Sequence, residues 1–152
     1  MRFHIVTLGR LRNAGLAAAV REMEHRASRY WPLQVHELEL PSITRHGRWP
    51  SAVLARLEAR LPPASLVVCH EVGTTFDSSA FARWLRELRE GSVHDVAFVI
   101  GGPYGVPDNL LERAWRRLSM APWTLSHEVA RLVLAEQLYR AGTIVRGEPY
   151  HK

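Results

Sequence analysis

Cysteine, lysine and long apolar runs are nearly absent from this chain of 152 residues. Cys69 is the only cysteine, which excludes an intrachain disulfide and a zinc site built on several thiolates. No apolar stretch approaches the roughly 20 residues that cross a bilayer. Residues 1–6 resemble a first strand and not a signal peptide. We therefore expect a cytoplasmic protein with no membrane partner and no metal.

Positive charge is in excess, and almost all of it is arginine. Twenty Lys and Arg oppose fifteen Asp and Glu, which gives a net charge of +5 and an isoelectric point of about 10.1. Arginine suits phosphate recognition because its planar fork can donate two hydrogen bonds at once. The same excess is also compatible with a simple solubilising surface. Charge therefore permits a nucleic-acid partner without requiring one.

Strand-like and helix-like segments alternate along the whole chain. The strands of the second half are continuous apolar runs, which favours an α/β domain over residues 1–152 with a parallel sheet covered by helices on both faces. The patterns predict strands at 2–8, 33–40, 66–69, 96–100 and 123–125. They predict helices from Gly15 to Tyr30 and at 51–61, 78–90, 107–118 and 126–142, with Ser126 as an N-cap and Gly91 as a C-cap.

The last predicted helix is apolar on almost every side. Val129, Leu132, Val133, Leu134 and Leu138 leave little room for a polar face. Such a helix must be covered on more than one side. Either a second subunit covers it or it is the central helix of a monomer, and the small size of the domain favours a homodimer.

A glycine-rich turn follows one of the buried strands. Gly101, Gly102 and Gly105 stand where ligands bind in open α/β sheets, so the backbone could approach a ligand closely, and a side chain at Gly102 would occupy the ligand's space. A plain tight turn explains the glycines equally well. The sequence lacks GxGxxG, the phosphate-loop ending, GxSxG and HExxH. His127, in the first turn of the last helix, would face whatever the glycine turn holds.

Several segments together resemble a known family. They are Phe-Val-Ile-Gly-Gly-Pro-Tyr-Gly at 98–105, Leu-Ser at 118–119, Trp-Thr-Leu-Ser-His-Glu-Val-Ala-Arg at 123–131, Leu-Ala-Glu-Gln-Leu-Tyr-Arg-Ala at 134–141 and the tail Pro-Tyr-His-Lys at 149–152. Their order and spacing resemble the ribosomal RNA large subunit methyltransferase H family, a minimal group of the SPOUT (trefoil-knot) methyltransferases. The resemblance spans essentially the whole chain.

The resemblance implies a C-terminal trefoil knot that holds S-adenosylmethionine, mostly through backbone groups. The matching positions are Cys69, Gly102, Ala121, Pro122, Trp123, Thr124, Leu125 and Ser126. Two of them depart from the family pattern. Cys69-His70 stands where Leu-Asp is more usual, and the proline of Ala121-Pro122 removes one amide donor.

The resemblance also implies a homodimer that methylates N3 of a pseudouridine in 23S rRNA on the assembled ribosome. The N3 proton must be lost, which requires a base or a group that stabilises the anion. The candidate catalytic residues are His127, Arg131, Arg140, Tyr150 and His151. The alternatives are a knotted methyltransferase for another RNA such as tRNA and a non-catalytic ribosome-associated binding protein.

Overall fold

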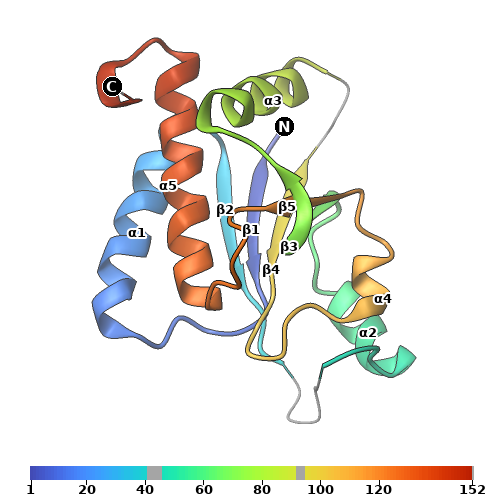
Figure 1. Cartoon of the computed structure of the whole chain (residues 1–152). Coiled ribbons are helices and arrows are strands. Elements are labelled where there is room, and N and C mark those ends of the chain that lie inside the picture. Colours follow the sequence, from blue (N-terminus) through green and yellow to red (C-terminus); the bar gives the residue numbers. More distant parts are fainter. Residues whose placement is uncertain (41–45, 92–94, 152) are drawn as a thin grey trace.

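A five-stranded parallel sheet forms the centre of the computed structural model, which describes residues 1–40, 46–91 and 95–151 (Figure 1). The strand order is β2-β1-β4-β3-β5. The strands are β1 (Phe3–Thr7), β2 (Leu33–Glu37), β3 (Ser65–Thr75), β4 (Val96–Ile100) and β5 (Arg116–Ser119). The helices are α1 (Ala14–Ser28), α2 (Ser51–Glu58), α3 (Ser78–Glu90), α4 (Asp108–Leu111) and α5 (His127–Val145), followed by a 3-10 turn at Pro149–His151.

Helices cover both faces of this sheet. The side chains of β1 pack on both sides of the sheet. Phe3 and Ile5 lie in the core cluster beneath α3 and α5, whereas Val6, and Leu8 just after the strand, lie in the cluster that includes α2. Because successive side chains of a strand point to opposite faces, a strand buried on both sides carries apolar side chains toward both faces. The prediction of a parallel α/β sheet covered on both faces is confirmed. The trefoil knot stays a prediction.

The predictions for two segments near the C-terminus are wrong. Residues 107–118 were expected to form one helix, but only Asp108–Leu111 is helical, and Arg116–Ser119 pairs with β3 as the edge strand β5. The expected strand at 123–125 lies in the loop before α5. Strand β3 continues to Thr75, with a shift of register between Cys69 and Thr74. Pairing with a distant strand therefore overrides the local helical pattern.

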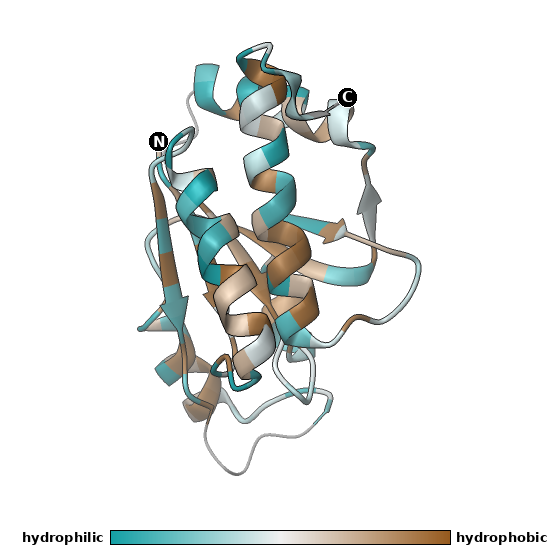
Figure 2. Cartoon of the chain, turned by 90° about the vertical axis from the view of Figure 1, so that its left-hand side faces the viewer, coloured by the Kyte–Doolittle hydropathy of each residue, from teal (hydrophilic) through white to brown (hydrophobic). Residues whose placement is uncertain are grey.

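Helix α5 begins and packs as its sequence predicts. The Ser126 side chain accepts a hydrogen bond from the backbone N–H of Val129 and caps the helix. Leu134 and Leu138 are fully buried, and the Trp31 indole N–H donates to the Leu138 carbonyl at 2.8 Å. Figure 2 looks at the face formed by α1 and α5. On α5, Val129, Leu132 and Val133 remain half-buried in the single chain.

Polar side chains inside the sheet are paired. His4 is buried, and its imidazole lies 3.0 Å from that of His36 and 3.3 Å from the Asp95 carboxylate. Burial, together with the nearby His4, lowers the pKa of His36. These contacts give His4 and His36 a structural role. Among the described residues, no helix is both long and apolar enough to span a membrane.

The close packing of α1 against α5 generates a stability prediction. A Cβ at Gly142 would lie 2.4 Å from Cγ of Tyr30, and Tyr30 is held by its hydrogen bond to Glu148. Gly142→Ala gains about 1 kcal/mol of helix propensity but overpacks this contact, which typically costs about 1–3 kcal/mol. We expect a net loss of stability in urea unfolding. In a Tyr30→Ala background the same substitution should be neutral or stabilising, and stabilisation in the native background would contradict the prediction.

Candidate functional site

A cleft with a volume of about 570 Å³ opens at the carboxyl ends of β4 and β5, beside residues 69–71 of β3. In open α/β sheets, ligands bind outside the carboxyl ends of the strands. Three segments supply most of its lining: the end of the buried part of β3, the glycine turn after β4 and the loop that joins β5 to α5. The main lining residues are Cys69, His70, Glu71, Ile100 to Val106, Met120, Ala121 and Trp123 to His127.

The glycine turn is shaped by close contacts within the chain. The Gly105 N–H donates to the Gly102 carbonyl at 2.9 Å, and Gly105 has a φ of +74°, a conformation that favours glycine. A Cβ at Gly102 would lie 1.9 Å from the carbonyl oxygen of Leu8. A side chain there would thus collide with the chain itself, which corrects the expectation that it would fill the ligand's space. Gly102 still lines the cleft.

The loop between β5 and α5 is tied to its surroundings at several points. The Ser119 hydroxyl donates to the Ala121 carbonyl at 2.9 Å. The Thr124 hydroxyl donates to the Glu71 carboxylate at 3.2 Å, which connects the loop to β3. Trp123 is 77% exposed although it lines the cleft. The loop therefore forms one fixed wall with a large aromatic side chain at the rim.

Seven of the eight residues expected to hold the cofactor line this cleft. They are Cys69, Gly102, Ala121, Trp123, Thr124, Leu125 and Ser126. Pro122 is exposed and is not among the lining residues. Burial raises the pKa of Cys69 to about 12, so its thiol is protonated at neutral pH and is a poor nucleophile. The role of each residue in binding stays a prediction.

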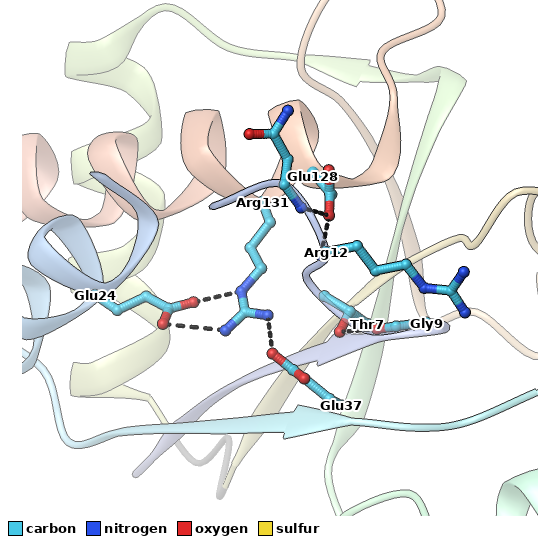
Figure 3. Close-up of polar contacts among 8 residues, drawn as sticks. Thr7, Gly9, Arg12, Glu24, Glu37, Glu128 and Arg131 are labelled. Atoms are coloured by element: carbon cyan, nitrogen blue, oxygen red, sulfur yellow. Dashed lines mark hydrogen bonds and ion pairs between the residues drawn. The ribbon is translucent and has the colours of Figure 1, made fainter. Parts of the chain in front are cut away.

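Of the predicted catalytic residues, His127 lies at the cleft. It is the first residue of α5, and its ring lies beside Gly9: Nε2 of His127 is 3.8 Å from where a Cβ at Gly9 would stand, and Cδ of Pro103 is 3.9 Å from the same point. The Thr7 hydroxyl donates to the Gly9 carbonyl at 2.9 Å (Figure 3). Gly9, two residues after β1, thus lies close to both the imidazole and the glycine turn.

Glu128, next along α5, fixes a second loop. Its carboxylate accepts the backbone N–H groups of Arg12 and Asn13, the latter at 3.0 Å (Figure 3). Both hydrogen bonds lower the pKa of Glu128, and the one from Arg12 has the larger effect. The carboxylate also stands at the positive end of the helix dipole. The segment that follows β1 is thereby joined to the start of α5.

Arg131 is buried and fully engaged by two carboxylates. Its side chain is 5% exposed, with Nε 2.7 Å from Glu24 Oε1 and Nη1 2.5 Å from Glu37 Oε1 (Figure 3). Burial by itself would lower the Arg131 pKa, but the hydrogen bonds to Glu24 and Glu37 raise it above its usual value. In this arrangement the guanidinium joins α5 to α1 and β2.

The remaining catalytic candidates lie toward the other end of α5. Arg140 is paired with Glu136 at 2.7 Å, and its guanidinium carbon lies 4.9 Å from the centre of the Tyr150 ring. The Tyr150 hydroxyl donates to Glu136 at 3.3 Å. Thirteen residues of helix separate His127 from Arg140, which corresponds to about 20 Å. The side chain of His151 lies outside the described part of the chain.

Sequence patterns did not identify two further residues at the cleft. His46 and Tyr104 line it, and their rings meet edge to face with centroids 5.8 Å apart. The position of Tyr104 inside a glycine turn was the available signal, because such a turn rarely buries an aromatic ring. Within the described residues, no group of three or more His, Cys, Asp or Glu could hold a metal ion.

The close approach at Gly102 generates a testable difference between two glycines of one turn. Gly102→Ala places a Cβ against the Leu8 carbonyl, so the turn must move, and we expect a loss of about 1–3 kcal/mol in urea unfolding. Gly105→Ala meets open space, and its cost, about 1–2 kcal/mol at most, comes from the positive φ alone. Gly102→Ala should also disturb ligand binding more strongly than Gly105→Ala. Equal binding by the two variants would contradict this account.

Comparison with known proteins agrees with this geometry. The family model described as "Predicted SPOUT methyltransferase" matches residues 1–151. A protein of Gemmatimonas aurantiaca named Ribosomal RNA large subunit methyltransferase H is 56% identical, and the alignment covers 100% of both chains. A protein of Anaeromyxobacter sp. with the same name is 41% identical, again over 100% of both chains.

Solved structures share the fold at low sequence identity. A probable methylase family protein of Haemophilus influenzae aligns with a TM-score of 0.56 and 15% identity over 99% of this chain and 70% of its own. A probable methyltransferase of Bordetella pertussis aligns with a TM-score of 0.55 and 17% identity over 92% of this chain and 95% of its own. Because the family model matches almost the whole sequence and the two named relatives are 56% and 41% identical over their full lengths, the chain belongs to the SPOUT methyltransferase family.

Proposed function

We propose that this protein transfers a methyl group from S-adenosylmethionine to N3 of a pseudouridine in 23S rRNA of the assembled ribosome. The observation that carries the proposal is the cleft at the strand ends, lined by seven of the eight residues expected to hold the cofactor. The name of the relatives, Ribosomal RNA large subunit methyltransferase H, supports ribosomal RNA as the substrate.

The cleft suits a nucleoside-derived cofactor. Its volume of about 570 Å³ falls within the range of roughly 300–1,000 Å³ that is usual for small-molecule sites. Much of its wall is loop, so backbone N–H and C=O groups are available for hydrogen bonds, while Ile100 and Leu125 offer apolar surface. When bound, S-adenosylmethionine supplies an electrophilic methyl group on a sulfonium.

His127 is the candidate acceptor for the proton that N3 of the base must lose. It is the one predicted catalytic side chain that lies at the cleft in the described structure. A positioned imidazole is the side chain that most often accepts a proton in general base catalysis. Arg131, one turn further along α5, is held by Glu24 and Glu37, so we assign it to positioning His127. Holding the two reactants in line supplies much of the remaining acceleration.

We infer that the active form is a homodimer in which the tail of one copy serves the cleft of the other. Arg140 is about 20 Å along the helix from His127 of its own chain, and Tyr150 packs beside Arg140. If these residues contact the substrate, a second subunit must supply them. The half-buried apolar residues Val129, Leu132 and Val133 on α5 support this face as the subunit contact.

The substrate is tested by mass spectrometry of RNA from a strain that lacks the protein. We expect 23S rRNA to lose one methyl group on a pseudouridine, and purified protein with S-adenosylmethionine to restore it on isolated ribosomes. The His127→Ala variant should restore it about 10²- to 10⁴-fold more slowly while binding S-adenosylhomocysteine normally. Loss of a methyl group from tRNA alone would favour the first alternative. Ribosome binding without any methyl change would favour a non-catalytic binding protein.

The two-subunit site is tested by mixing two inactive variants. Deletion of Tyr150 to Lys152 removes the contacts of Tyr150 with Glu136 and Arg140, but Tyr150 is not among the residues that line the cleft of its own chain. We therefore expect folding and cofactor affinity to stay nearly intact and methyl transfer to fall strongly. When this variant is mixed and re-equilibrated with His127→Ala, activity should return. A mixed dimer then has one cleft with an intact His127 and an intact tail from its partner. If mixed dimers are shown to form but activity does not return, the tail acts on the cleft of its own chain.

A further inference from the structure

A stack of aromatic rings lies beside the edge strand β5, outside the cleft. The rings of Phe76 and Trp84 are 5.2 Å apart and 12° from parallel, and those of Trp84 and Trp115 are 6.5 Å apart and 24° from parallel. Trp84 is 8% exposed, and Phe81 and Phe98 pack against it in the core. Trp115, in contrast, is 48% exposed. The outermost ring of the stack thus remains available to solvent.

Arg116 adds a positive charge to the same place. Its guanidinium carbon lies 5.3 Å from the centre of the Trp84 ring and 5.8 Å from that of Trp115. Among the residues that the structure describes, no carboxylate forms an ion pair with Arg116. Nearby Arg113, by comparison, is paired with Glu58. The side chains of Trp84, Trp115 and Arg116, which we call the Trp115 platform, therefore combine flat aromatic surface with an uncompensated charge.

The platform stands at the opposite end of β5 from the cleft. Strand β5 runs from Arg116 to Ser119, and the next residues, Met120 and Ala121, line the cleft. Four strand residues span about 13 Å. A polynucleotide whose reacting base occupies the cleft can therefore reach the platform with a few neighbouring nucleotides.

We propose that the Trp115 platform binds an unpaired base of the RNA substrate, which stacks on Trp115 while Arg116 contacts the base or its phosphate. This inference rests on the proposed function, because it extends the substrate site along β5. Every base has a flat face that can stack on an indole, and arginine contributes both cation–π and phosphate contacts. Trp115 is the outermost ring of the stack and is half-exposed, so its surface is accessible to a base.

RNA is favoured over a protein occupant by charge. A protein docked on this edge would have to supply a carboxylate for Arg116, or bury the guanidinium without one. RNA supplies a phosphate at every nucleotide. The net charge of +5 also favours a polyanion. Contact with a second copy of the chain is therefore kept as an outcome of the test.

The experiment measures binding of a short, labelled single-stranded oligoribonucleotide by fluorescence anisotropy. We expect Trp115→Ala to weaken binding about tenfold, since one stacked base is lost, and Trp115→Phe to retain much of the affinity. Arg116→Gln should weaken binding more than Arg56→Gln. The latter removes the same charge from an exposed position on α2, across the sheet. Trp115→Phe, at a half-exposed ring, and Arg116→Gln, which keeps a polar side chain at a half-buried position, keep the test valid if Trp115→Ala does not fold.

Further measurements separate the possible results. All four variants should bind S-adenosylhomocysteine as the native protein does and should remain in the same oligomeric state by light scattering. In methyl transfer, Trp115→Ala should raise KM for the RNA and leave kcat nearly unchanged. Native affinity of Trp115→Ala for the oligonucleotide, or a change of oligomeric state in the variant, would overturn the proposal.

Failure of the proposed function gives a different pattern. If the native protein binds the oligonucleotide through Trp115 but methylates no ribosomal RNA, the proposed base-binding role of the platform is supported and the proposed reaction is wrong. If the native protein methylates ribosomal RNA and Trp115→Ala leaves both KM and oligonucleotide affinity unchanged, the proposed reaction is supported and the proposed role of the platform is wrong.

Discussion

Arg131 extends from α5 into the interior, where the carboxylates of Glu24 on α1 and Glu37 on β2 surround its guanidinium. The side chains of Arg131 and Glu24 are only 5% and 11% exposed, and taking two charged groups out of water costs several kcal/mol unless close ion pairs with good hydrogen-bond geometry offset it. A small displacement of α5 would leave at least one buried charge without its partner. The position of α5 relative to α1 and β2 is therefore narrowly defined.

The geometry of the cleft follows from this position. His127 lies four residues before Arg131 on the same face of α5, so the contact that holds Arg131 also orients the start of the helix. Glu128 then ties the segment after β1 to the same turn, through the N–H groups of Arg12 and Asn13. The loop that enters the helix is fixed by Ser126 and Thr124. The loop between β5 and α5, which lines the cleft, and the segment after β1 are thus both held at the start of α5.

Sequence patterns predicted most of the fold because most of its elements carry a local signal. The helix at 78–90 is observed with the predicted bounds, since Asp77 caps it and apolar residues mark one face. Strand β5 has no such signal: Arg116 and Arg117 make it polar, and only its pairing with β3 buries Leu118 and Ser119. The shape of the glycine turn could not be predicted from the sequence either, because the Leu8 carbonyl that Gly102 contacts is 94 residues away in the sequence.

The same distinction between local and long-range signals applies to charge. Arg131 and Arg140, two of the predicted catalytic residues, are each paired with carboxylates of their own chain. An exposed ion pair is worth only about 0–1 kcal/mol, so Arg113 can exchange Glu58 for a phosphate at little cost. Arg131 cannot do so without leaving two carboxylates unpaired. The positive charge available to RNA is therefore that of the arginines that are unpaired or weakly paired. Among the described residues, the side chain of Arg116 has only aromatic partners. It is better placed to bind RNA than Arg131 or Arg140.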